Sequence, residues 1–355
     1  MLCSIIKGTR SYIPEVLVKN TDFLTSEFYD SEGQKIESSP KEIIEKFHKI
    51  TNISERRYVS KEYVTSDIAA FAAANCISSA NIDKETIDYI IAAHNFGDVK
   101  NTDRKSDIVP SLASRVKYKL NIKNPATVAY DIIFGCPAWL QALIQANYYL
   151  KSGDAKRVLV IGAEVLSRVS DPHDRDSMLY SDGAGAVLLE AENCKNPKGV
   201  LAYSSYTYTD GLAYLLGMGR SYKKDYFPQL FLKMNGRKLY EFALTYVPTV
   251  VKECIDKAKL KFNQIKKILL HQANEKMDVA ILQRLFALFS IKEIDLSIMP
   301  MTIDKLGNNS VATLPILLDL ILKGQLENHK IEKGDNVVFA SVGAGMNINA
   351  VAYRF

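Results

Sequence analysis

The chain has 355 residues, of which 47% are hydrophobic, so it can bury one large core or two of ordinary size. Its 45 Lys and Arg residues outnumber 40 Asp and Glu residues, and the net charge of +5 is spread along the chain rather than gathered in a basic run. This weak, dispersed charge argues against a nucleic-acid partner, but it suits encounters with an acidic partner.

Cysteine usage and the absence of long apolar runs indicate the compartment. The five cysteines are an odd, scattered set without a CxxC pair: Cys3, Cys76, Cys136, Cys194 and Cys254. Such a set is typical of a reducing compartment. The apolar start of the chain soon meets charge and Pro14, and no apolar stretch reaches 18 residues. We therefore expect a soluble cytoplasmic protein with no membrane partner and no metal site.

Short runs of β-branched residues alternate with longer stretches of helical periodicity, which is typical of α/β layering. Four segments of the first half are predicted to be buried strands: 87–93, 127–133, 157–162 and 184–190. A helix is predicted over 137–150, because Leu140, Leu143 and Ile144 share one face.

The second half repeats this rhythm. Segment 265–270 is predicted to be a strand running into His271, just as the earlier strand runs into His94, and a helix follows from about Asn274. Segment 335–355 indicates a strand, a glycine turn and a strand, and so it resembles 157–190. These echoes predict an internal duplication.

A polar, Pro- and Gly-containing segment at 191–200 is the predicted boundary between the two copies. We predict an N-terminal half of residues 1–195 that carries the nucleophile and a C-terminal half of residues 196–355 that carries a histidine and an asparagine. Segment 203–232 is rich in Tyr and Gly without a clear period. It is either an irregular insertion over a pocket or a surface loop.

The candidate nucleophile is Cys136, in the sequence FGCPAW. A predicted strand ends at Phe134 and Gly135, and Pro137 is favoured at the first position of a helix. Cys136 is therefore predicted to be the N-cap residue, beside free backbone N–H groups and the positive end of the helix dipole. That setting lowers a thiol pKa from about 8.5 towards neutrality. The alternative is one more buried structural cysteine.

Three further positions have polar groups or glycines that suit a catalytic site. His271 lies in HQAN at the end of a predicted strand, where catalytic groups gather in α/β folds, although a lone histidine is often structural. Asn308 lies in GNNS, where it or Asn309 can equally be a turn or N-cap residue. Gly343 and Gly345 can bring backbone N–H groups to an oxyanion, or they can mark a tight hairpin.

Taken in order, FGCPAW, HQAN, GNNS and the terminal SVGAG resemble the β-ketoacyl-ACP synthase III family. The stretches RVLVIGAEVLSRVSDPHDRDSMLYSDGAGAVLLE and MNGRKLYEFAL support this resemblance, which covers nearly the whole chain. It implies a duplicated thiolase-like α/β fold in five layers, αβαβα, usually assembled as a homodimer.

The resemblance also implies a mechanism. Cys136 would take an acyl primer as a thioester, and His271 and Asn308 would hold the carbonyl of a malonyl or β-ketoacyl thioester while it loses CO2. Neutral N–H donors of this kind stabilise an enolate oxygen. The backbone N–H groups of Cys136 and Gly345 would form a second oxyanion hole. No cofactor is implied beyond the phosphopantetheine or CoA arm of the thioester substrates.

Acyl carrier protein is the macromolecular partner that the resemblance implies. Lys276 and Arg284 share one broad face of the helix after His271, and Lys276 stands at the basic position with which the family binds the carrier. The alternative is a solvated helix face. Arg175, in DPHDRDS, matches a family position on the nucleotide side of the entrance.

Two departures from the family pattern concern the substrate. The Trp and Arg that clamp a CoA adenine are matched here by Lys46 and Ile50, which cannot form a π-stacked clamp, so a carrier-bound primer is favoured over free acyl-CoA. Val109 stands where the partner subunit usually supplies a Phe that caps the acyl pocket. This smaller cap predicts a longer or bulkier acyl chain.

The leading hypothesis is therefore a β-ketoacyl-ACP synthase III-like enzyme. Four alternatives stay open: a ketosynthase of the dialkylresorcinol or aryl-polyene type that joins two carrier-bound acyl chains, a transfer-only acyltransferase, a non-catalytic partner subunit and a cysteine hydrolase. A partner subunit would be expected to lack the nucleophile, and Cys136 is present.

Overall fold

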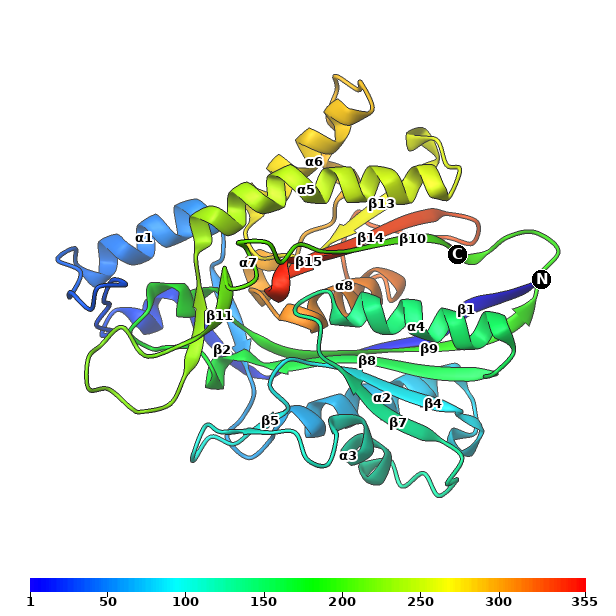
Figure 1. Cartoon of the computed structure of the whole chain (residues 1–355), viewed down its shortest axis with the longest axis horizontal. Helices are drawn as coiled ribbons and strands as arrows, with labels where there is room; N and C mark the ends of the chain where they lie inside the picture. Colours follow the sequence, from blue (N-terminus) through cyan, green and yellow to red (C-terminus); the bar gives the residue numbers. More distant parts are fainter.

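The computed structural model describes residues 1–355 and arranges them in five layers, in which helices and sheets alternate (Figure 1). The first sheet has five strands in the order β1 (Leu2–Tyr12), β9 (Asp182–Asn193), β8 (Arg157–Val165), β4 (Tyr89–Ala93) and β7 (Val128–Ile132). The second has four, in the order β10 (Gly199–Thr207), β15 (Asn347–Arg354), β14 (Asn336–Gly343) and β13 (Ile265–Leu270).

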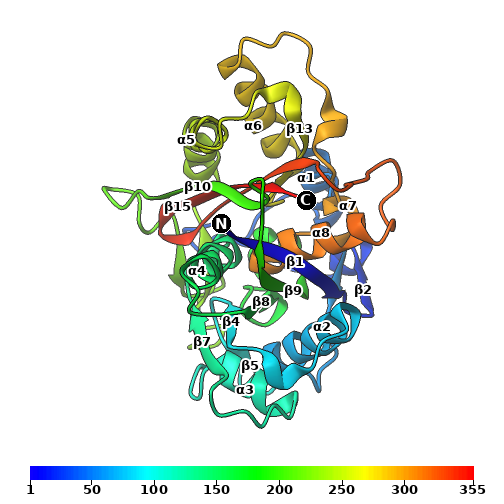
Figure 2. The same cartoon turned by 90° about the vertical axis from the view of Figure 1, so that its right-hand side faces the viewer.

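Helices form the other three layers. The middle layer is α4 (Ala138–Ser152) and α8 (Thr313–Leu322), which lie between the sheets and contact both of them (Figures 1 and 2). The outer layer on the first sheet is α2 (Thr65–Ala80) and α3 (Leu112–Lys119). The outer layer on the second sheet is α5 (Gly236–Lys257) and α6 (Glu275–Leu288). Helix α1 (Pro40–Thr51) contacts α6 and lies at one end of the molecule (Figure 1).

Smaller elements complete the chain. Four further strands form the pairs β2 (Val16–Lys19) with β3 (Glu55–Tyr58), and β5 (Asp98–Val99) with β6 (Ser106–Asp107). Another hairpin pairs β11 (Leu216–Gly219) with β12 (Phe231–Met234), and the four-residue helix α7 spans Ile303–Leu306. No helix combines the length and the apolar character that a bilayer crossing requires.

The two sheets repeat one topology. In the first, β1–β9 and β9–β8 are antiparallel and β8–β4 is parallel; in the second, β10–β15 and β15–β14 are antiparallel and β14–β13 is parallel. Strand β7 is an additional parallel neighbour of β4. The chain crosses from the first sheet to the second between Asn193 and Gly199. The predicted duplicated, five-layered thiolase-like fold is confirmed.

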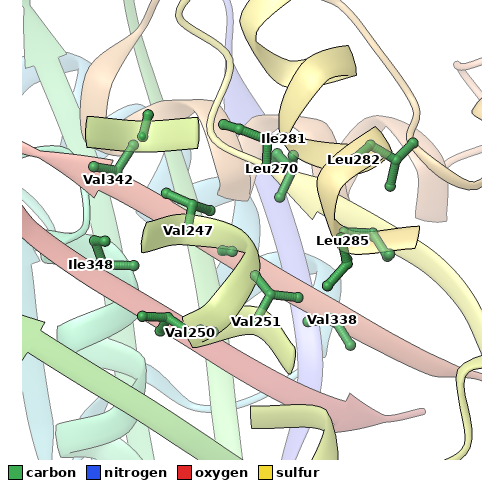
Figure 3. Packing of buried hydrophobic residues seen from close by; sticks show 14 of the residues in the cluster. Val247, Val250, Val251, Leu270, Ile281, Leu282, Leu285, Val338, Val342 and Ile348 are labelled. Atoms are coloured by element: carbon green, nitrogen blue, oxygen red, sulfur yellow. The ribbon is translucent and has the colours of Figure 1, made fainter. Parts of the chain in front are cut away.

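Apolar side chains at helical spacing hold the outer helices to the second sheet. Val247, Val250 and Val251 of α5 stand at positions i, i+3 and i+4 and pack in one buried cluster with Leu285 of α6 and Val338 of β14 (Figure 3). Each fully buried side chain of this size contributes about 1.5–3 kcal/mol. Helices α5 and α6 are thus fixed to the second sheet by one continuous core.

Several local predictions are confirmed and two need correction. Strand β13 has the predicted bounds, and α4 differs from its prediction by one or two residues at each end. Segment 127–133 was expected to be buried, but β7 is an edge strand whose Val128 is 48% exposed. Segment 203–232 is not wholly irregular, because its first residues belong to β10, whereas the rest contains the β11–β12 hairpin.

Candidate active site

A largely apolar cavity of about 340 Å³ lies where the two halves meet, and Cys136, His271 and Asn308 all line it. The β11–β12 hairpin contributes Met218 and Leu232 to its wall, which matches the predicted insertion over a pocket. A hollow of about 540 Å³ adjoins this catalytic cavity and shares Asn308 with it. The three residues singled out in the sequence thus line one cavity, and the outer hollow adjoins that cavity.

Two glycine turns position Cys136. Gly135 has a φ of +66°, and a Cβ there would lie 2.6 Å from the backbone N of Ala344. A Cβ on Gly343 would lie 2.4 Å from the backbone N of Cys136. Only glycine permits backbones to approach so closely. The nucleophile turn of the first half therefore packs directly against the glycine turn of the second half, which contains Gly345.

The helix after Cys136 begins one residue later than predicted. Pro137 is the N-cap of α4, and its carbonyl accepts a hydrogen bond from the N–H of Gln141 at 3.0 Å. Cys136 therefore precedes the N-cap instead of occupying it. Its own backbone N–H donates no bond among those of the turns and loops. This N–H is available to a ligand in the cavity.

The predicted lowering of the Cys136 pKa is wrong. Burial raises the pKa of this thiol to about 11, the Glu164 carboxylate adds to the rise, and a hydrogen bond from Ser310 opposes it. Loss of hydration by the thiolate outweighs the field of the nearby helix terminus. Cys136 is thus protonated at neutral pH. It is nevertheless the only cysteine that is not fully buried, so the structural alternative describes the other four.

His271 is fixed by the strand that precedes it. Its backbone N–H donates to the Ala340 carbonyl at 2.8 Å and extends the β13–β14 ladder. Burial lowers the pKa of the imidazole to about 4, so the ring is neutral at physiological pH. Its Nδ1 has no hydrogen-bond partner. In the same motif, Asn274 caps α6 by accepting from the Met277 N–H at 3.2 Å.

The side-chain amide of Asn308 is oriented by its neighbours. Its backbone exchanges hydrogen bonds of 2.9 Å with Leu179 and Ser181, and its Oδ1 accepts from the Ser310 N–H at 2.8 Å. With the oxygen occupied, the amide nitrogen is left to face a ligand. Asn309 occupies the N-cap position of the short helical turn η7 (Ser310–Ala312), but its side chain makes no cap hydrogen bond and its Nδ2 donates instead to the Asp182 carbonyl at 2.9 Å.

Three polar residues were not predicted to be functional: Asn95 and Ser310, which line the cavity, and the buried Glu164. The Ser310 hydroxyl donates to the Cys136 sulfur at 3.4 Å, Asn95 Nδ2 donates to Ser310 Oγ at 3.3 Å, and Asn95 Nδ2 also donates to Glu164 Oε2 at 2.7 Å. Asn95 follows β4, so its place at a strand end was the available signal. Glu164 lies inside an apolar run that indicates only a strand.

His94, which follows strand β4, is fully buried. Its Nε2 lies 2.9 Å from Asp131 Oδ2, and its Nδ1 accepts from the Gly97 N–H at 3.0 Å. Both ring nitrogens are therefore engaged within the chain. Asp131 also accepts from the first N–H groups of α3, at Leu112 and Ala113. His94 thus belongs to a structural hydrogen-bond network at the start of α3.

The remaining candidates lie outside the catalytic cavity. Lys46, Ile50 and Arg175 line the outer hollow. Lys276 is exposed on α6, and Arg284 donates to the Leu244 carbonyl of α5 at 3.0 Å.

Val109 is 81% exposed and does not line the cavity of its own chain. Its loop is held by Arg115, which donates to the Pro110 carbonyl at 2.9 Å and forms an ion pair with Asp107 at 2.6 Å. A single chain therefore presents Val109 outward on a tethered loop.

The chain is similar to one family along most of its length. Residues 130–211 match the model of 3-oxoacyl-[acyl-carrier-protein (ACP)] synthase III, and residues 255–355 match the model of its C-terminal part. The chain is 30% identical to the β-ketoacyl-[acyl-carrier-protein] synthase III of Prochlorococcus marinus (strain NATL2A), over 98% of this chain and 94% of that protein. It is equally similar, at 30%, to the synthase of the same name from Staphylococcus haemolyticus (strain JCSC1435), over 99% and 98%.

A solved structure agrees with the sequence matches. The 3-oxoacyl-[acyl-carrier-protein] synthase III from Aquifex aeolicus VF5 superposes with a TM-score of 0.79 at 30% identity, and the match covers 99% of this chain and 100% of that one.

Proposed function

Since the chain belongs to the β-ketoacyl-ACP synthase III family of condensing acyltransferases, we propose that it joins two acyl thioesters through an acyl-enzyme on Cys136. The observation that carries this proposal is the convergence of Cys136, His271 and Asn308 on one cavity from three distant parts of the chain. The thiol in the cavity wall, the neutral imidazole and the oriented amide each suit a different step.

In the first step the sulfur of Cys136 attacks the carbonyl carbon of the primer thioester. The backbone N–H groups of Cys136 and Gly345 are placed to hold the oxyanion, because the two glycine turns bring these backbones together. The carrier thiol leaves and takes up the proton that Cys136 loses. Because the resting thiol is protonated, forming the thiolate is part of the cost of this step.

In the second step the extender, a malonyl group on acyl carrier protein, loses CO2. His271 and Asn308 donate hydrogen bonds to its thioester oxygen, on which the enolate charge develops. A neutral imidazole serves as a donor without adding a buried charge. The carbanion then attacks the acyl-cysteine, and the thiolate leaves and is protonated again.

The approach to the cavity supports a carrier-bound substrate. Arg175 and Lys46 line the outer hollow, and Lys276 stands on α6 next to its lining residue Met277. These cations share the hollow with the acidic Glu42 and Asp176, and they are the groups that would contact an acidic carrier protein delivering its substrate on a phosphopantetheine arm. No further cofactor is needed. The position of Ile50 in the hollow offers no stacking surface for an adenine, which favours carrier protein over CoA as the donor.

A second copy of the chain would complete the cavity. Ile133 lines the cavity yet is 58% exposed, and the adjoining edge strand β7 has free backbone groups along one side. An apolar, unpaired edge is a natural pairing surface. We place Val109 of the partner subunit over the acyl chain. A homodimer is therefore proposed, and the five free cysteines favour its location in the cytoplasm.

A second candidate function is the joining of two long carrier-bound chains, as in dialkylresorcinol or aryl-polyene assembly. The small Val109 and the apolar cavity wall favour it over a short-chain primer. A transfer-only enzyme would acylate Cys136 without releasing CO2. A hydrolase would need a group that orients the histidine, and His271 Nδ1 has no partner. A non-catalytic subunit would not need a cysteine in this cavity.

The test is to incubate the protein with acyl-ACP and acyl-CoA of several chain lengths and to weigh it intact. We expect a mass gain of one acyl group from long or branched acyl-ACP, and none in Cys136→Ala. His271→Ala and Asn308→Ala should acylate yet fail to release CO2 from malonyl-ACP. Efficient labelling by acetyl-CoA would contradict the donor assignment, and undiminished CO2 release would remove the substituted residue from the mechanism.

A further inference from the structure

We propose that Ser310 is the positioning residue that prepares Cys136 for acylation, and that Asn95 and Glu164 hold its hydroxyl in the required orientation. The proposal deepens the proposed function, on which it rests for the identity of the nucleophile. It begins from a chain of donors in which each hydrogen bond determines the direction of the next.

Ser310 donates hydrogen bonds to two of the three groups that the mechanism uses. Its backbone N–H donates to Asn308 Oδ1 at 2.8 Å, and its hydroxyl donates to Cys136 Sγ at 3.4 Å. It is only 5% exposed and has a φ of +51°, a left-handed conformation that is uncommon for a residue other than glycine. A buried residue in such a conformation is held there by its surroundings, and here both polar groups point to the reacting centre.

Asn95 determines where the Ser310 hydrogen points. Asn95 Nδ2 donates to Ser310 Oγ at 3.3 Å, so that oxygen is already an acceptor. A hydroxyl has a single hydrogen, which is thereby left for the sulfur of Cys136. The hydrogen bonds are therefore donated in one direction, from Asn95 to Ser310 and from Ser310 to Cys136.

Glu164 determines which way the Asn95 amide faces. Its Oε2 accepts from Asn95 Nδ2 at 2.7 Å and from the Asn95 backbone N–H at 3.0 Å. If the amide were turned over, its oxygen would face the carboxylate, and the Ser310 hydroxyl would lose its donor. Glu164 is fully buried, and its Oε1 has no partner. An unpaired carboxylate oxygen is costly in this setting, which argues that the acid is retained for a reason other than packing.

The charge of Glu164 acts on the same sulfur. Four side chains with titratable or hydroxyl groups face Cys136 from different elements: Glu164 from β8, His271 after β13, Tyr180 before β9 and Ser310 from η7. His94, held by Asp131, faces Glu164. The Ser310 hydroxyl favours the thiolate, whereas an ionised Glu164 disfavours it. Burial raises the pKa of Glu164 to about 7, so this opposition grows above neutrality.

The experiment is to measure alkylation of Cys136 by iodoacetamide from about pH 6 to about pH 10, with peptide mass spectrometry to separate it from the buried cysteines. It needs no acyl substrate. Ser310→Gly removes the hydroxyl and keeps the backbone N–H and the left-handed conformation. Ser310→Ala removes the same hydroxyl but strains the backbone. Glu164→Gln keeps an acceptor for both Asn95 donors and removes the charge.

We expect Ser310→Gly and Ser310→Ala to alkylate roughly 3- to 10-fold more slowly than the parent at every pH, because the thiolate loses its donor while its intrinsic reactivity rises in part compensation. Glu164→Gln should alkylate faster by a similar factor at about pH 9, and the difference should vanish at about pH 6, where Glu164 of the parent is protonated. Ser341→Ala is the matched control, because it deletes another buried serine hydroxyl, one without a partner.

Unchanged alkylation in both Ser310 variants would overturn the proposal, as would slowing that follows their thermal stability rather than the missing hydroxyl. A Glu164→Gln profile parallel to that of the parent at all pH values would remove the carboxylate from the account. These outcomes are separate from the proposed function, because condensation by the parent enzyme is measured without reference to alkylation. A shifted alkylation profile in a protein that condenses no substrate would leave the Ser310 assignment standing alone.

Discussion

The duplicated halves place a histidine at the same topological point, and the two histidines differ in everything else. His94 follows β4 and His271 follows β13, which are the corresponding strands of the two sheets. Both ring nitrogens of His94 are engaged within the chain, by Asp131 and the Gly97 N–H, and His94 does not line the cavity, whereas His271 does. Both histidines thus follow a strand end. A histidine whose two ring nitrogens bond within the chain is structural, whereas the histidine that lines the cavity can contact a substrate.

The largest expected effect is on the reactive member of this pair. His271→Ala should lower CO2 release from the extender by about 10²–10³-fold, because one donor to the enolate oxygen is lost. Acylation of Cys136 should continue, and unfolding by urea should change little. The assay is release of labelled CO2 under single-turnover conditions. If His271→Ala lost stability but kept the parent rate of CO2 release, His271 would be the structural histidine and the assignment would be contradicted.

The converse substitution addresses stability. His94→Ala should destabilise the fold by about 2–4 kcal/mol, because it leaves a cavity, the largely buried Asp131 carboxylate loses one of its partners and the Gly97 N–H loses its acceptor. Urea unfolding measures this loss. The rate per folded molecule should change within about threefold, since His94 does not line the cavity. A rate loss as large as that of His271→Ala, without destabilisation, would break the comparison.

Acid titration sharpens the same contrast. Burial lowers the pKa of His271 to about 4, below the value of about 6.5 for an exposed histidine. The unfolded state therefore binds the proton first, so this contribution to stability is complete above about pH 6.5 and is lost as the pH falls towards about 4. When the pH is lowered from about 7 to about 5, the free energy of unfolding of the parent should fall by roughly 2 kcal/mol more than that of His271→Gln. Equal losses in urea unfolding at the two pH values would show that the imidazole is not desolvated.

The smallest effect concerns Lys276 and Arg284 on α6. Like the two histidines, one of them bonds within the chain and the other does not. Both residues are exposed, but Arg284 donates to the Leu244 carbonyl, whereas Lys276 forms no side-chain hydrogen bond within the chain. Arg284→Ala should cost about 0.5–1.5 kcal/mol of stability. Lys276→Ala should leave stability unchanged and weaken carrier-protein binding several-fold at low salt, with the difference shrinking as salt rises. Binding that does not depend on Lys276 at any salt concentration would remove it from the carrier surface.

The sequence carried enough to predict the architecture, because the architecture depends on repeated local patterns. The strand that ends at His271 and the helix after Cys136 were found from periodicity, and the echo between the halves corresponds to the repeated sheet order. The edge position of β7 was missed, since an apolar run looks alike at the edge and in the centre of a parallel sheet.

The site was predictable in its members and not in its electrostatics. The motifs around Cys136, His271 and Asn308 indicated residues that the fold brings to one cavity. The direction of the Cys136 pKa was wrong, because burial and the field of Glu164 arise from residues distant in sequence. Ser310 was missed for the same reason, since its hydroxyl is oriented by Asn95, which lies more than two hundred positions earlier in the sequence.

The most direct test follows the acyl group itself. Cys136 would be loaded with a carbon-13-labelled acyl chain, the acyl-enzyme isolated, and malonyl-ACP added in a single turnover. We predict that the label leaves Cys136 and appears in a β-ketoacyl thioester on the carrier, with one CO2 released for each chain transferred. A label that stays on the cysteine, or departs as the free acid or as an ester, would contradict condensation through Cys136.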